Sequence, residues 1–123
     1  MKRIISVILV MVMVLALSGC GAPDGFTKNT YKAAKEALSV INSFTSGKMD
    51  AAAAVIQLDT LAKSMEAETA TITDAAEKAN TTEIALILRG VIYTINRANG
   101  NVSDLEMNNI QITADILERK LKG

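Results

Sequence analysis

The sequence contains no histidine and no tryptophan, and it has one cysteine and one proline in 123 residues. Without histidine, the commonest general base and a frequent metal ligand are missing. The Glu-x-x-His pairs that build di-metal sites in helical bundles are excluded for the same reason. Pro23 is the single proline, so nothing after it interrupts a helix. The lack of proline after residue 23 favours an all-α protein. The lack of histidine leads us to expect no metal, no cofactor and no enzymatic activity.

Other motifs of catalysis and ligand binding are missing as well. The sequence has neither a glycine-rich phosphate loop nor a Gly-x-Ser-x-Gly elbow. Residues 99–104 offer oxygen ligands but lack the alternating acidic residues of a calcium loop, so we expect one helix to end and another to begin there. Two acidic pairs have helical spacing, and their polar neighbours favour a solvated face over an acid–base role. These pairs are Asp74 with Glu77, and Asp115 with Glu118.

The first twenty residues have the order of an export signal. A basic start is followed by an uncharged, apolar run at residues 4–17, and small residues precede Cys20. As a helix, that run would extend about 21 Å, which is short of the roughly 30 Å hydrocarbon core of a bilayer. A cleaved signal is therefore favoured over a permanent transmembrane span.

The residues Leu17-Ser18-Gly19-Cys20 resemble the lipobox of bacterial lipoproteins. In that family the cysteine thiol receives a diacylglyceryl group and becomes the new N-terminus. The resemblance covers the first twenty residues, and it implies a signal peptide at 1–19, a palmitate-type lipid on Cys20 and a place on the outer face of a bacterial cell-envelope membrane. It also explains the odd cysteine count, since exported chains normally pair their cysteines. The alternative is a plain cleaved signal that leaves a free thiol.

The charge balance of the mature chain argues against nucleic acid as a partner. The sequence has 13 basic and 13 acidic residues, so loss of Lys2 and Arg3 leaves a small acidic excess. We expect residues 20–26 to comprise the lipidated cysteine and a tether, and residues 27–123 to form one domain. Residues 21–25 extend at most about 17 Å, so the domain is expected close to the membrane surface.

Apolar residues recur at helical spacing along the mature chain and predict about four helices in a small antiparallel bundle. The first helix is predicted at 27–46, where Gly47 ends it. Residues 50–79 keep one apolar phase and form either one helix or two, since the threonine-rich stretch at 69–73 weakens helix propensity.

Capping patterns predict the last two helices. Residues 80–83 offer a cap for a third helix that reaches about Ala98. Ser103 and Glu106 form a capping box for a final helix that reaches about Lys122. With almost no aromatic residues, the core should consist of Leu, Ile and Ala in closely approaching helices.

The third and final predicted helices each carry a second apolar stripe opposite the stripe expected in the core. A helix of a bundle buries an arc somewhat wider than about 100°, so two opposed stripes exceed what the core covers. We interpret the second stripes as a surface for self-association or for a protein partner. The alternatives are helices covered on both sides, or scattered exposed residues. The second stripes consist of Leu86, Gly90 and Tyr93, and of Leu105, Ile112 and Ile116.

Three lysines share one face of the first predicted helix: Lys28, Lys32 and Lys35. Each basic group near an anionic bilayer contributes about 1 kcal/mol of attraction. We therefore predict that this face turns towards the membrane, with an ordinary solvated helix face as the alternative.

Together these patterns predict a lipid-anchored, extracytoplasmic helical domain that acts by protein contact in a structural or adaptor role. The alternative of another class is a binding protein for a small apolar ligand held between the helices. That alternative requires a cavity in the core, and we expect its lining to be Leu58, Met65, Leu88 and Leu117.

Overall fold

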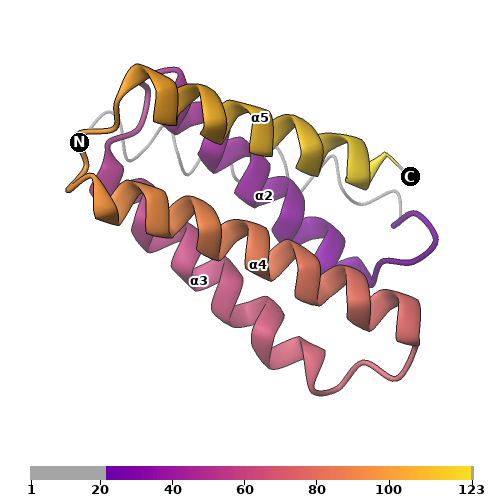
Figure 1. Cartoon of the computed structure of the whole chain (residues 1–123). Coiled ribbons are helices and arrows are strands. Elements are labelled where there is room, and N and C mark those ends of the chain that lie inside the picture. Colours follow the sequence, from indigo (N-terminus) through magenta and orange to yellow (C-terminus); the bar gives the residue numbers. More distant parts are fainter. Residues whose placement is uncertain (1–21, 123) are drawn as a thin grey trace.

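The computed structural model describes residues 22–122, so the predicted signal peptide and Cys20 lie outside the described residues. The described chain folds as an antiparallel helical bundle (Figure 1), which confirms the predicted all-α class. No strand occurs between residues 22 and 122. The helices are α2 (Lys28–Thr45), α3 (Ala51–Thr69), α4 (Ala75–Arg97) and α5 (Asp104–Leu121).

The helices form a closed ring. Each helix packs on its neighbours in sequence, and α2 also packs on α5. The contact between α3 and α4 is the most extensive of these, and the contact between α4 and α5 is the least extensive. Figure 1 shows the start of α2, the turn at residues 70–74 and the end of α5 at one end of the bundle, which we call the tether end. The loops at 46–50 and 98–103 form the distal end.

Each helix begins at a residue whose side chain accepts a hydrogen bond from a free backbone N–H of the first turn. The predicted capping box of Ser103 and Glu106 is present. The loop before it ends α4 through left-handed backbone at Asn99 and Gly100, as expected for a helix stop. The four N-caps are Thr27, Asp50, Asp74 and Ser103.

The predicted start of the third helix at residues 80–83 is wrong. Helix α4 begins at Ala75, because Asp74 accepts the N–H of Glu77 and starts the helix one and a half turns earlier. Residues 70–74 form the turn before it, so the threonine-rich stretch separates two helices. Ala76 and Ala79 are exposed and do not continue the core stripe of the preceding helix.

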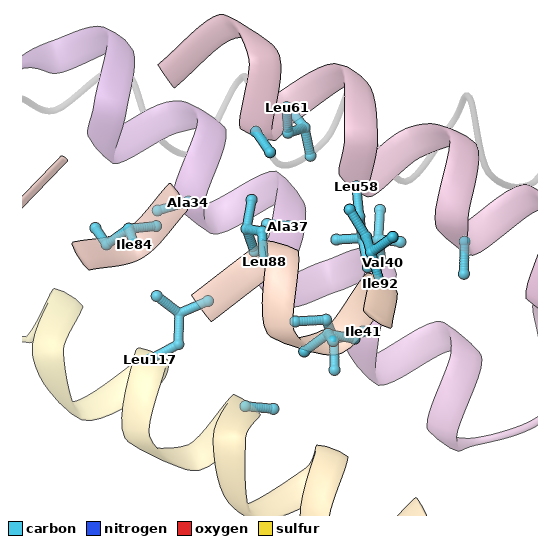
Figure 2. Close-up of a cluster of buried hydrophobic side chains, with 14 of the residues drawn as sticks. Ala34, Ala37, Val40, Ile41, Leu58, Leu61, Ile84, Leu88, Ile92 and Leu117 are labelled. Atoms are coloured by element: carbon cyan, nitrogen blue, oxygen red, sulfur yellow. The ribbon is translucent and has the colours of Figure 1, made fainter. Parts of the chain in front are cut away.

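The core is aliphatic, and Figure 2 shows side chains from all four helices meeting in it. Each of the four helices has alanine at one or more buried positions, which allows the helix backbones to approach closely. Each large aliphatic side chain moved from water into such a core contributes roughly 1.5–3 kcal/mol. The largest fully buried apolar side chains are Ile41, Leu58, Met65, Ile84, Leu88, Ile95 and Leu117.

Two fully buried threonines connect α2 with α4 near the tether end. The hydroxyl oxygens of Thr30 and Thr81 lie 2.8 Å apart. Thr30 also lies within hydrogen-bond distance of Glu68 Oε2, at 3.3 Å, and Thr81 donates to the carbonyl of Glu77 at 2.8 Å. Each hydroxyl can donate one proton. The two threonines therefore have two protons for three contacts, which are with each other, with Glu68 and with the Glu77 carbonyl. Because α3 supplies Glu68, the cluster fixes the register of three helices.

The threonine pair makes a measurable contribution to stability. Thr30→Val keeps the shape of the side chain but removes the hydroxyl that contacts Thr81 and Glu68, so we expect the free energy of unfolding to fall by about 0.5–1.5 kcal/mol. The double variant Thr30→Val/Thr81→Val should lose less than the sum of the two single variants, because each single variant already removes the contact that the two hydroxyls share. Urea unfolding of all four proteins measures this difference, and strict additivity would contradict the pairing.

Candidate protein-contact surface

The second apolar stripes predicted on the last two helices lie exposed. Leu105 is 71% exposed, and the least exposed of the five large side chains, Ile112, is 49% exposed. Residues 22–122 therefore do not cover these stripes. Ile56 on α3 is also exposed, and the periodicity of the sequence did not single it out. The large exposed members of the stripes are Leu86, Tyr93, Leu105, Ile112 and Ile116.

These side chains lie on the outer surface of α4 and α5, and Tyr93 borders a hollow that Glu106 and Asn109 of α5 also line. A shallow groove of about 350 Å³ follows the seam between α4 and α5, with Gly90 and Thr94 on one side and Asn109 and Thr113 on the other. At about 100° per residue, Leu86 and Tyr93 lie beside Gly90 on the outer flank of α4, and the exposed residues of α5 lie beside Asn109. We call this surface the α4–α5 face. It comprises Leu86, Gly90, Tyr93, Leu105, Ile112 and Ile116.

Gly90 leaves the backbone of α4 uncovered at the groove. A Cβ added to Gly90 would meet nothing within 4 Å, so the packing of this bundle does not require glycine there. Glycine inside a helix costs roughly 1 kcal/mol relative to alanine. The missing side chain instead allows another backbone to approach the middle of α4 closely.

Charges at the rim of the α4–α5 face are of both signs. Arg97 and Glu106 line a hollow beside Tyr93 near the distal end. Lys120 Nζ lies 2.8 Å from Glu83 Oε2 and joins α5 to α4. With the signs interspersed, the face does not match a strongly acidic or strongly basic partner.

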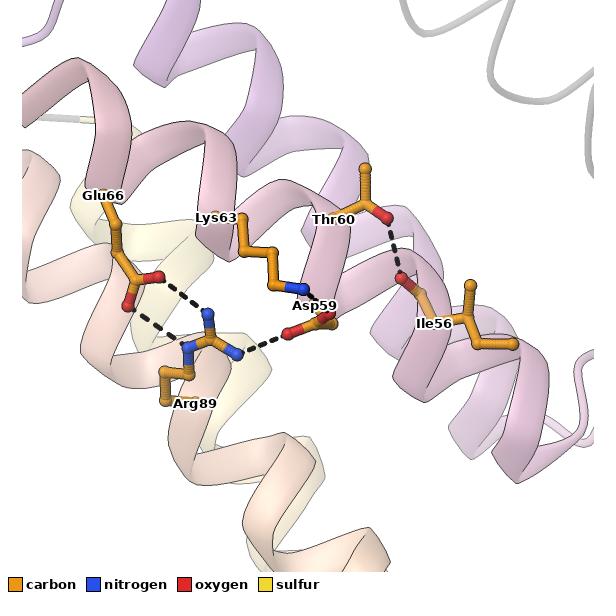
Figure 3. Close-up of polar contacts among 6 residues, drawn as sticks. All are labelled: Ile56, Asp59, Thr60, Lys63, Glu66 and Arg89. Carbon is orange, nitrogen blue, oxygen red and sulfur yellow. Dashed lines mark hydrogen bonds and ion pairs between the residues drawn. The ribbon is translucent and has the colours of Figure 1, made fainter.

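A separate charged cluster joins α3 to α4, and its residues are drawn in Figure 3. The Arg89 guanidinium donates to Glu66 at 3.2 and 2.7 Å and also to Asp59. These hydrogen bonds hold the pKa values of Asp59 and Glu66 below their ordinary values and raise the pKa of Arg89. Because the charges are partnered, the cluster works as a cross-link and not as an acid–base site.

Sequence reasoning missed this cross-link. Asp59, Lys63 and Glu66 lie on one face of α3 at helical spacing, and Lys63 Nζ is 3.1 Å from Asp59 Oδ2. That spacing was visible in the sequence. The partner Arg89 belongs to another helix, and its place depends on the register of α3 against α4, which single-helix periodicity does not contain.

The acidic pairs weighed as catalytic groups have structural contacts. Asp74 caps α4, and Glu118 lies 3.7 Å from Lys122. Asp115 accepts from the Gln111 side chain at 3.4 Å. Among residues 22–122, no cluster of three metal-ligating side chains occurs.

The lysine face of α2 is only partly free. Lys28 is exposed, whereas Lys32 and Lys35 are half-buried. Lys35 Nζ lies 4.8 Å from the centroid of the Tyr31 ring, which gives the ammonium a favourable cation–π contact. Glu36 lies on the same helix, and burial raises the pKa of its carboxyl although nearby Lys32 acts in the opposite direction.

A groove of about 630 Å³ lies between α2 and α5. Tyr31, Leu38 and Leu121 supply its apolar lining, and several lysines and Glu118 supply charge. It lies at the surface, so it is not the apolar core cavity that the ligand-binding alternative requires. The four residues expected to line that cavity are at most 1% exposed and pack in the core: Leu58, Met65, Leu88 and Leu117.

Comparison of the chain with protein-family models, with curated proteins and with solved structures found no match. In the part of the chain that the structure describes, none of the helices combines the length and apolar character needed to cross a membrane.

The Arg89 cross-link gives stability a defined pH dependence. A carboxyl whose pKa is lower in the folded state stabilises the fold above its unfolded pKa, and that contribution is lost as the pH falls through the folded value. We therefore expect Arg89→Gln to lower the melting temperature slightly and by a constant amount above about pH 5, since the ordinary pKa values of Asp59 and Glu66 are 3.8 and 4.5. The difference should shrink below about pH 4. Thermal unfolding at a series of pH values tests this, and a difference that grows in acid would contradict it.

Proposed function

We propose that the mature protein is a lipid-anchored helical bundle of the bacterial cell envelope that acts by protein contact through its α4–α5 face. The lipobox-like residues before Cys20 support the anchor. The observation that carries the contact role is the grouping of exposed apolar side chains along one seam, since monomeric soluble proteins rarely leave contiguous apolar surface uncovered. The role is structural or adaptor-like, with no cofactor and no nucleic acid.

The partner we propose for the α4–α5 face is a second copy of this chain. Helices of 23 and 18 residues extend about 34 and 27 Å. With axes roughly 8–10 Å apart and a helix diameter of about 10 Å, the pair is roughly 18–20 Å wide and presents roughly 500–600 Å². Stable complexes bury about 800 Å² on each partner. The pairing is therefore expected to be weak in solution, and the balanced rim charges do not oppose it. Confinement to one membrane raises the effective concentration and compensates for the low affinity.

Self-association predicts a concentration-dependent mass. We expect the lipid-free chain, residues 21–123, to be monomeric when dilute and to approach dimer mass as its concentration rises. Ile112→Asn/Ile116→Asn should keep the monomer mass throughout, because it removes the two central apolar contacts of α5. Light scattering over a concentration series measures both proteins.

The matched control for that experiment is Ile56→Asn. Ile56 is more exposed, at 67% against 49% for Ile112 and 50% for Ile116, but it lies on α3 and not on the α4–α5 face. Its substitution should leave the mass unchanged relative to the parent protein. A parent protein that stays monomeric at all concentrations, or an equal effect of both variants, would contradict self-association through this face.

The lipid anchor is tested separately at Cys20. In a bacterium fed a labelled fatty acid, we expect the parent protein to incorporate the label and to remain with the membrane fraction. Cys20→Ser should incorporate none and leave that fraction, because the acceptor thiol is absent. Cys20→Ser that is labelled and retained like the parent protein would exclude this anchor.

A further inference from the structure

The segment that precedes α2 is docked on the bundle. The backbone N–H of Phe26 donates to the carbonyl of Pro23 at 3.3 Å, which closes a tight turn. Gly25 is the third residue of this turn and has a φ of 90°, a conformation that favours glycine. The Phe26 side chain is buried in the core, and Ala22 packs against the core as well. Residues 22–26 therefore do not behave as a free linker, although the sequence suggested a tether there.

Side chains from α3 and α4 hold the docked segment. Asn80 Nδ2 donates to the carbonyl of Gly25 at 2.7 Å. Thr27 Oγ1 donates to Glu68 Oε1 at 2.7 Å. An added Cβ at Gly25 would lie 3.0 Å from Asn80 Nδ2, so a larger residue would have to displace the Asn80 side chain and would also be strained at this positive φ. The chain thus enters the bundle at a fixed place, beside the last turn of α3 and the start of α4.

Chain length then limits the distance between Cys20 and the bundle. One residue, Gly21, separates Cys20 from Ala22. Two residues of extended chain reach at most about 7 Å. Any anchor on Cys20 is therefore held within about 7 Å of the docked segment, and the tether end is the part of the bundle nearest to it.

Exposed charges distinguish between an end-on and a side-on orientation. Lys28, Lys78 and Lys122 are exposed and lie at the tether end, where Asp24, Asp74 and Glu77 offset their charge and Glu118 pairs with Lys122. This end therefore has charges of both signs and does not require an anionic lipid surface. A side-on orientation would instead use the lysine face of α2. That face is weakened, because Lys35 is engaged with Tyr31 and the Glu36 carboxyl lies on the same helix.

We infer that the docked segment holds the bundle end-on at the membrane, with the turn at 70–74 towards the lipid surface and the helices pointing away from it. This orientation rests on the proposed lipid anchor at Cys20. The α4–α5 face then runs along the membrane normal and is presented sideways, to other proteins anchored in the same membrane. The tether end, with its exposed lysines, is the surface that meets the lipid headgroups.

Energy transfer from a single tryptophan measures this orientation, because the chain has no tryptophan of its own. Thr73→Trp places the donor in the turn at the tether end, and Asn101→Trp places it in the distal loop, at exposed positions in both cases. The mature chain is attached to phosphatidylcholine vesicles that carry a headgroup-linked acceptor. We expect transfer to be several-fold more efficient for Thr73→Trp than for Asn101→Trp, since α4 separates the two donors by roughly 30 Å.

Undocking the segment should abolish this difference. Gly25→Ala and Asn80→Ala each disrupt the contact between residues 25 and 80, and we expect the transfer from the two donors to become similar. Gly47→Ala is the matched control. It introduces the same kind of backbone strain at a positive φ, but at the distal end and with open space around the new Cβ. The difference between donors should survive in Gly47→Ala.

Equal transfer from both donors in the docked protein would overturn the inference, and so would a difference that persists in Gly25→Ala and Asn80→Ala. Repeating the measurement on vesicles that contain anionic phosphatidylglycerol distinguishes the end-on orientation from a side-on orientation through the lysine face. The side-on orientation requires anionic lipid and weakens with salt. Coupling the Cys20 thiol to a maleimide lipid keeps the test independent of biological lipidation. A failed anchor is thus recognised in cells by the Cys20→Ser comparison, and a failed orientation is recognised on vesicles.

Discussion

The cluster around Glu68 is the contact on which the arrangement of this bundle depends. Its half-buried carboxylate accepts from Thr27 and Thr30, and Thr30 contacts the buried Thr81, so this polar cluster connects α2, α3 and α4. Apolar packing is tolerant of small axial shifts, whereas a buried hydrogen bond is lost when its partners slide apart. The aliphatic core therefore supplies most of the stability, and this cluster selects one register.

The fixed alignment of α2, α3 and α4 at the tether end also determines where residues 22–26 join the bundle. Asn80 reaches the carbonyl of Gly25 only because α4 begins at Ala75 and carries Asn80 past the end of α3. At the opposite end, local capping and the packing of Val102 against the core hold the α4–α5 connection, and this seam has the least extensive contact of the ring. The bundle is thus most constrained at the tether end and along the α3–α4 contact, and it is most open where its apolar side chains remain exposed.

The sequence was informative wherever a feature depends on one helix. Leu105, Ile112 and Ile116 could be predicted as a second stripe because periodicity alone places them opposite the core. The start of α4 was missed because Asn80 and Thr81 look like a cap, while their side chains bond to Gly25 and Thr30. Contacts between distant segments have no local sequence pattern. The docking of Phe26 and the partners of Arg89 could not be predicted for the same reason, because both depend on how the helices are aligned with one another.

The docked segment limits the reach of the protein. With the proposed lipid on Cys20, a bundle as long as α4, about 34 Å, together with at most about 7 Å of extended chain, would occupy a layer no thicker than roughly 40 Å above the membrane. A lipoprotein with a long flexible linker samples a much deeper volume and meets its partners by diffusion in three dimensions. If Cys20 carries the proposed lipid, this chain does not have that range, and its encounters take place in two dimensions, among molecules that diffuse in the same membrane.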